Sequence, residues 1–101
     1  MNARTTALSA LIAIRRQNAW ADGALKDYAA RDRIDRRDAA LAARLLYGVV
    51  QNCMLLDFYL AQAVSSPLAK LQPVVLDILR LGAYQILFLD KIPVSAAVNE
   101  A

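Results

Sequence analysis

The segment from Pro73 to Leu89 constrains the fold most, because it predicts a helix that is apolar on almost every side. Pro73 suits the first helical position, where its missing N–H is not needed. Asp77, Arg80 and Gln85 are the strongly polar exceptions in the segment. A helix of this kind is normally buried in the middle of a domain. The rest of the chain must therefore supply shorter amphipathic helices that surround it.

Composition favours an all-α domain. Hydrophobic residues make up 58% of the 101 residues, and the excess over an average globular chain is mostly Ala and Leu, which favour helices. Gly and Pro, three each, are too few for a turn-rich β protein. No long stretch alternates apolar and polar residues, as a half-buried strand does. We therefore expect a single all-α domain over residues 1–101.

Apolar periodicity and capping residues predict about six helices, the last of them truncated. Asn2 and Asp35 are expected caps of the first and third helices, and Asp22 of the second. A break is expected at Gln51-Asn52. The predicted helices span about residues 3–18, 23–31, 36–51, 53–64 and 73–89, and a further helix starts at about 94. Because that helix stops unfinished at 101, we expect the chain to be a fragment of a longer protein.

Four residues within or between these helices suggest packing roles. We expect Trp20 to be a buried plug in the corner between the first two helices, with stacking on a nucleobase as the alternative. Gly48 and Gly82 interrupt predicted helices at a cost of about 1 kcal/mol relative to Ala, which suggests two places where backbones come close. Cys53 has no basic neighbour within three positions, so we interpret it as a buried small hydrophobe and not a reactive thiol.

Several kinds of chemistry are excluded by residue type. The chain has no histidine, so it cannot contain a histidine acid–base pair, a histidine triad or a histidine zinc site. Gly23, Gly48 and Gly82 stand far apart, which excludes a glycine loop that cradles phosphate or a cofactor. We expect no catalytic residue, no metal ligand and no cofactor site within this chain. A single cysteine and no uncharged run near the about 20 residues that cross a bilayer suggest a cytoplasmic protein that is not in a membrane.

The charge distribution points to a polyanion as partner. The net charge is +3, but residues 1–50 carry nine Lys and Arg against five Asp, which makes that half +4. Nine of the twelve basic residues are Arg, which binds phosphate in two-point geometry and stacks on bases. A basic, Arg-rich half is typical of nucleic-acid binding. A merely solvated surface is the alternative.

Short pieces spread along the chain carry a resemblance to a known family. They are Leu79-Arg80-Leu81-Gly82-Ala83-Tyr84-Gln85, Asp90-Lys91-Ile92-Pro93, Ala97-Val98-Asn99-Glu100-Ala101, Asn2-Ala3-Arg4, Trp20-Ala21-Asp22, Leu45-Leu46-Tyr47-Gly48-Val49 and Leu55-Leu56-Asp57. In this order and spacing they resemble the NusB-like family, an all-α RNA-binding fold of about seven helices. The family occurs as a free transcription antitermination factor and as the N-terminal domain of ribosomal RNA small-subunit cytosine-5 methyltransferases. Gln85 and the sparsely basic start Asn2-Ala3-Arg4 resemble the methyltransferase branch more closely.

The resemblance implies RNA as the partner and binding as the function. It places RNA at the start of the first helix, which nominates Arg4; Arg15, Arg16, Arg36 and Arg37 are weaker candidates from charge alone. It also implies a downstream methyltransferase domain, absent here, that binds S-adenosylmethionine. The face that a seventh helix should cover is then bare, which suggests a homodimer through that face.

Four residues are predicted to have structural roles. They are Arg80, Gly82, Asn99 and Glu100. Arg80 lies in a nearly apolar helix and needs a partner, because an unpaired buried charge is costly. We expect Glu100 to pair with Arg80 or Arg4, and Asn99 to hydrogen-bond the backbone near the 90–93 turn.

Overall fold

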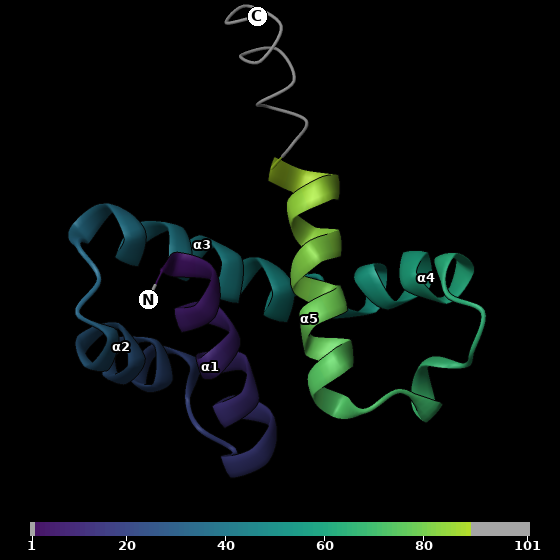
Figure 1. The fold of residues 1–101 in the computed structure, drawn as a ribbon, viewed down its shortest axis with the longest axis horizontal. Coiled ribbons are helices and arrows are strands. Elements are labelled where there is room, and N and C mark those ends of the chain that lie inside the picture. The colour runs from purple at the N-terminus through teal and green to yellow at the C-terminus, as the bar shows by residue number, and fades with distance from the viewer. Residues whose placement is uncertain (1, 90–101) are drawn as a thin grey trace, which may run out of the picture.

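The computed structural model describes residues 2–89, which form an all-α bundle (Figure 1). Its helices are α1 (Ala3–Gln17), α2 (Ala21–Asp32), α3 (Arg36–Gln51), α4 (Cys53–Ala63) and α5 (Pro73–Tyr84). A 3-10 turn, η1 (Leu68–Lys70), precedes α5, and a π-helical turn, η2 (Gln85–Leu89), follows it. The predicted last helix, with Asn99 and Glu100, lies outside the described residues.

The starts of four helices can be compared with the sequence prediction, and three of them agree with it. The Asn2 side chain accepts a hydrogen bond from the Thr5 N–H at 3.0 Å, and the Thr5 hydroxyl oxygen accepts one from the Asn2 N–H at 3.1 Å. Asp35 caps α3 by accepting from the Asp38 N–H at 2.8 Å. Pro73 is at the start of α5, as predicted. The exception is α2, which starts at Ala21, so that Asp22 lies in the first turn and accepts instead from the Tyr47 hydroxyl.

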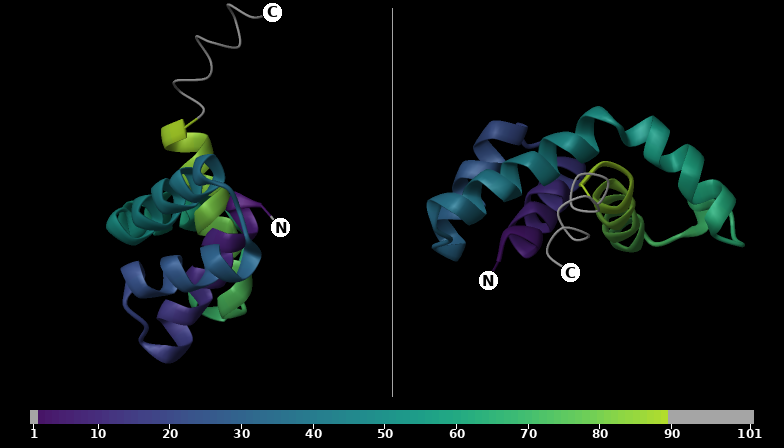
Figure 2. Two further views of the ribbon diagram at one scale, coloured as in Figure 1. Left: turned by 90° about the vertical axis from the view of Figure 1, so that its left-hand side faces the viewer. Right: turned by 90° about the horizontal axis from the view of Figure 1, so that it is seen from above.

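The helices are arranged around α1 and α5. Helix α1 packs against α2 and α3, and α5 contacts α1, α3 and α4. Figure 2, seen from above, shows α3 and α4 as a bent arch with α5 on its concave side. The bend between α3 and α4 is 79°, and it falls at the predicted break, where the Asn52 side chain donates to the Gly48 carbonyl at 2.8 Å. Within residues 2–89 no single helix is long and apolar enough to cross a membrane. Helices α3 and α4 together reach that length and apolar composition, but they are bent relative to each other.

The core is built from large residues of α3 and α4 and small residues of α1. Leu45, Leu46 and Leu56 are fully buried. Leu8 and Ile12 of α1 are only half-buried. The buried positions of α1 are instead mainly alanines: Ala3, Ala7, Ala10 and Ala13, with Thr6 and Leu11. Because alanine is small, α1 can lie close to α2 and α3.

Burial of α5 is less complete than its sequence predicts. Leu81 and Tyr84 are buried, but Ile78 and Ile86 on the same helical run are 48% and 65% exposed. A groove of about 440 Å³ runs between α4 and the α5–η2 segment. We call it the α4–α5 groove; its lining is Tyr59, Leu60, Ala63, Ile78, Leu79, Gly82, Ala83, Ile86 and Leu87. The prediction of burial on nearly all sides fails here, because α1, α3 and α4 cover only part of the circumference of α5.

The two helical glycines have different roles. A Cβ at Gly48 would overlap the ring of Tyr84, so the predicted close approach exists, although the partner is a side chain and not a backbone. At Gly82 no heavy atom among the described residues lies within 4 Å of a Cβ position. The prediction of a close crossing at Gly82 is therefore wrong for this part of the chain. Gly82 instead lines the α4–α5 groove.

Gly48→Ala should lower the free energy of unfolding by about 1–3 kcal/mol, because the added methyl displaces the Tyr84 ring from a packed site. Gly82→Ala is the matched control and should be neutral or up to about 1 kcal/mol stabilising, since Ala is the better helix former. Urea denaturation of both variants measures the difference. Equal stability of the two variants would contradict the assigned Gly48–Tyr84 contact.

Candidate nucleic-acid interface

Arg4 lies at the start of α1 and is held by the first residue of η2. Its Nε donates a hydrogen bond to the Gln85 side-chain oxygen at 2.6 Å. The Gln85 amide nitrogen in turn donates to the Leu81 carbonyl at 3.2 Å, which fixes the orientation of Gln85. Arg4 nevertheless remains exposed. It is a positioned cation at the surface where α1 meets η2.

Arg15, at the other end of α1, is exposed but paired with a buried carboxylate. Its Nε and Nη2 both contact Asp77 Oδ2, at 3.0 and 2.9 Å. Asp77 is only 4% exposed and lies on α5. A buried carboxylate needs such a partner, because an unpaired buried charge is costly. Arg15 therefore joins α1 to α5, a structural role that charge alone did not predict.

Arg80 makes a second bridge, from α5 to α4. Its Nε and Nη2 donate to the two oxygens of Asp57 at 2.7 and 2.8 Å, the two-point geometry that Arg favours with carboxylates. The hydrogen bond that Arg80 donates to Asp57 raises the pKa of Arg80 above its ordinary value. The sequence indicated that Arg80 needs a partner but did not identify Asp57. The predicted pairing of Arg80 or Arg4 with Glu100 falls outside the described residues.

These two bridges border a small pocket of about 210 Å³ that also includes Cys53. Cys53 is half-buried, and burial raises the pKa of its thiol, so it is protonated at neutral pH. The two guanidinium groups at the pocket are already paired with Asp77 and Asp57. Between residues 2 and 89 no group of three His, Cys, Asp or Glu is arranged to hold a metal. The pocket is a structural junction between α1, α3, α4 and α5.

The remaining candidate arginines are exposed and do not form one cluster. Arg16 is in the last turn of α1, and Arg36 and Arg37 begin α3. Arg4 and Arg16 are twelve residues apart on α1, or about 18 Å along the helix axis. Exposed Arg33 and Arg44 add to this charge, although the sequence pattern did not single them out. The basic residues mark an extended surface, which suits a phosphate chain better than a single small anion.

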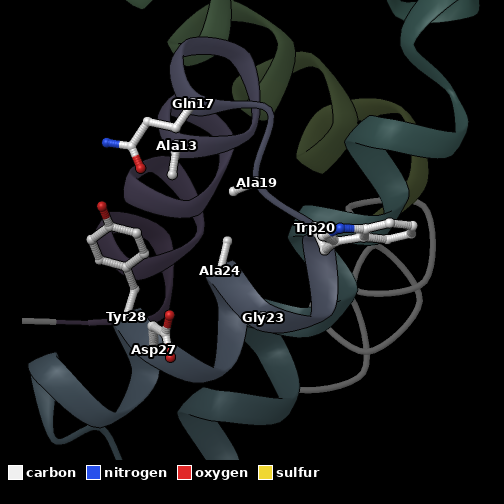
Figure 3. Close-up of a pocket in the computed structure, with 8 residues that line it drawn as sticks. All are labelled: Ala13, Gln17, Ala19, Trp20, Gly23, Ala24, Asp27 and Tyr28. Carbon is white, nitrogen blue, oxygen red and sulfur yellow. The ribbon is translucent and has the colours of Figure 1, made fainter.

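Trp20 is 86% exposed, so the prediction of a buried plug is wrong. Smaller neighbours, Ala19 and Ala21, pack against the core at this corner instead. Trp20 occupies the N-cap position of α2 and its side chain makes no capping bond. Figure 3 shows the indole directed away from the neighbouring side chains. The alternative that the sequence left open, a stacking surface, is the one that this geometry permits.

Beside Trp20 lies a hollow of about 290 Å³ between α1 and α2, which we call the corner hollow. Small residues and a few polar ones line it together with Trp20: Ala13, Gln17, Ala19, Gly23, Ala24, Asp27 and Tyr28 (Figure 3).

The Arg31 guanidinium lies 4.4 Å from the centre of the Tyr28 ring. Arg31 also donates to Asp32 at 2.8 Å, and this hydrogen bond, with one from Thr6, lowers the pKa of Asp32.

The whole chain, residues 1–101, matches the model of the NusB family. The chain belongs to the NusB family. Two of its relatives are proteins named "Probable ribosomal RNA small subunit methyltransferase B". The one from Bacillus subtilis is 36% identical over 97% of this chain and 22% of the relative. The one from Synechocystis is 33% identical over 98% of this chain and 22% of the relative.

A second group of NusB-family relatives matches less of the chain. The transcription antitermination protein NusB of Caldicellulosiruptor saccharolyticus is 34% identical over 63% of this chain and 50% of the relative. The chain spans about a fifth of the length of the methyltransferase relatives it matches, 22% in both cases above. No solved structure matches the chain significantly.

Arg15→Ala should lower the free energy of unfolding by about 1–3 kcal/mol, because it leaves the buried Asp77 carboxylate without its cation. Arg16→Ala, one position along and exposed, is the control and should change stability by less than about 0.5 kcal/mol. Thermal and urea unfolding measure both. If Arg15→Ala is as stable as the native chain, the bridge between α1 and α5 does not contribute as described.

Proposed function

We propose that this chain is the RNA-binding N-terminal module of a ribosomal RNA (cytosine-5) methyltransferase. The observation that carries the proposal is the extent of the match. The methyltransferase relatives match 97% and 98% of the chain, whereas the NusB antitermination relative from C. saccharolyticus matches 63%. In this proposal the arginines hold the RNA backbone and present a target loop to a separate catalytic domain. That domain binds S-adenosylmethionine, and the protein acts in the cytoplasm.

The described residues of the chain support binding. Arg4 is positioned by Gln85, and Arg16, Arg36 and Arg37 extend from the surfaces of α1 and α3. Arginine contacts with phosphate release counterions, so they produce affinity that falls with salt. Asp77 and Asp57, two carboxylates near the middle of the bundle, are held by Arg15 and Arg80. In these ion pairs the two carboxylates link α5 to α1 and α4.

The runner-up is a free antitermination factor that binds RNA and docks a ribosomal protein. It is supported by the similarity to NusB of C. saccharolyticus over 63% of the chain. Both functions use the same RNA-binding surface, so the difference between them concerns the partner. The sequence of the gene beyond codon 101 separates them, since only the first requires a methyltransferase domain there.

Titration of a fluorescently labelled ribosomal RNA fragment at several salt concentrations tests RNA binding. We expect affinity that falls steeply with salt, and a slope of log affinity against log salt that decreases by about one for each phosphate-contacting Arg replaced by Ala. Arg16→Ala and the pair Arg36→Ala with Arg37→Ala are the variants. Lys70→Ala, on η1 and exposed, is the charge-matched control and should leave the slope unchanged. Absence of binding at low salt would leave only a structural role for the domain.

A homodimer is a further part of the proposal. Tyr59, Ile78 and Ile86 are exposed at the α4–α5 groove, and an apolar patch of this size favours association. Sedimentation of the 101-residue chain should show a concentration-dependent dimer that Ile86→Glu dissociates. Met54→Glu, at an 89% exposed apolar residue outside the groove, is the control and should leave the dimer intact. A monomer at every concentration would contradict the dimer.

A further inference from the structure

We propose that the corner between α1 and α2 binds unpaired nucleotides of the RNA, with Trp20 as the platform on which a base stacks. This inference rests on the proposed RNA-binding function and adds a specific subsite to it. Its starting point is the exposure of Trp20, at 86%, in a position where the fold does not use the side chain. The core at this corner is closed by Ala19 and Ala21. Trp20 is therefore free of a structural task among the described residues.

The corner hollow next to Trp20 has the character of a nucleotide subsite. Its volume of about 290 Å³ is at the small end of the range for ligand sites, about 300–1,000 Å³. Ala13 and Ala24 give it an apolar floor, and at Gly23 no described atom lies within 4 Å of a Cβ position. A flat ring can therefore approach the α2 backbone closely. The corner hollow has room for one base or one ribose, next to a second base that stacks on Trp20.

Polar groups at the rim can read the edge of a base. Gln17 offers an amide donor and acceptor, and Asp27 offers a carboxylate that accepts from an exocyclic amino group. Both are exposed, and Figure 3 shows them on the same side of the hollow as Tyr28. Tyr28 is held in place by the Arg31 guanidinium, 4.4 Å from its ring centre. These are the contacts by which proteins recognise unpaired bases, namely stacking and hydrogen bonds to the edges of the base.

The polar surroundings of the corner suit a nucleotide better than an apolar protein partner. Arg16 is exposed in the last turn of α1, next to Gln17 of the hollow. Lys26 is exposed on α2. Asp22 and Asp27 are exposed at the same corner, so its charges are balanced and stacking on Trp20 is expected to contribute more to binding here than phosphate contacts. An isolated aromatic side chain with polar and basic neighbours matches single-strand binding, where aromatic platforms and cationic residues alternate.

The experiment uses the fluorescence of Trp20, the single tryptophan of the chain. A short single-stranded RNA of mixed sequence is titrated into the 101-residue chain, and binding is measured independently by the anisotropy of a label on the RNA. We expect strong quenching of Trp20 by the single strand and much weaker quenching by the duplex made with its complementary strand. Trp20→Ala should bind the single strand about 5- to 100-fold more weakly. Because stacking releases no counterions, the salt slope of this variant should equal that of the native chain.

Two control variants sharpen the test. Trp20→Phe keeps a ring and should recover most of the affinity, and its recovery excludes a loss through misfolding. Met54→Ala removes another large exposed apolar side chain, 89% exposed and on α4, and should leave affinity unchanged. RNA binding with unchanged Trp20 fluorescence and native affinity in Trp20→Ala would overturn this proposal and leave the RNA-binding function intact. Absence of RNA binding by anisotropy would overturn both the Trp20 proposal and the RNA-binding function.

Discussion

The packing of Tyr84 against Gly48 is the contact on which the rest of the fold depends. Gly48 lies near the end of α3, and only a residue without a side chain leaves room for the Tyr84 ring. The ring is also stacked on Phe88 of η2, with centroids 5.0 Å apart. The contact fixes where α5 crosses α3, just before the bend at Asn52 that redirects the chain into α4. Helix α5 can therefore touch α1, α3 and α4 at once.

Two ion pairs hold α5 in place in addition to the Gly48–Tyr84 contact. They divide the arginines into two groups. Arg15 and Arg80 link α5 to α1 and α4 through Asp77 and Asp57. Asp77 is the buried member of these pairs, so removal of Arg15 would leave a poorly solvated charge. Arg4, Arg16 and the pair at the start of α3 remain at the surface. In the proposed function this second group meets RNA. The charge count of the sequence thus overstates the number of cations that are free to bind phosphate.

Local features could be predicted from the sequence because they depend on neighbouring residues. The caps at Asn2 and Asp35, the proline start of α5 and the break at Asn52 are of this kind. The membership of the NusB family is also confirmed. Partners across helices could not be predicted, because Asp57 and Arg80 are 23 positions apart and meet only once α4 and α5 are packed.

The failures at Trp20 and Gly82 have one physical cause. Tryptophan side chains are usually largely buried, and a glycine within a helix often marks a close contact. Whether a particular Trp or Gly follows this tendency depends on which helix faces pack against each other. The alanines of α1 and α2 fill the corner without Trp20, and the described part of the chain places nothing against Gly82. Both residues are therefore at surfaces. For Trp20 this change is the basis of a functional hypothesis, since an exposed indole between basic and polar neighbours is suited to a base.

The most direct test of RNA binding by this domain is an NMR titration of the isotopically labelled chain with a single-stranded ribosomal RNA fragment. Backbone amide and indole shifts report contact residue by residue. We predict the largest shifts at the two ends of α1, at the start of α3 and at the Trp20 indole, with the α4–α5 groove unaffected. Shifts confined to the α4–α5 groove, or no shifts at low salt, would contradict the proposal that this NusB-family domain holds RNA through α1 and α3.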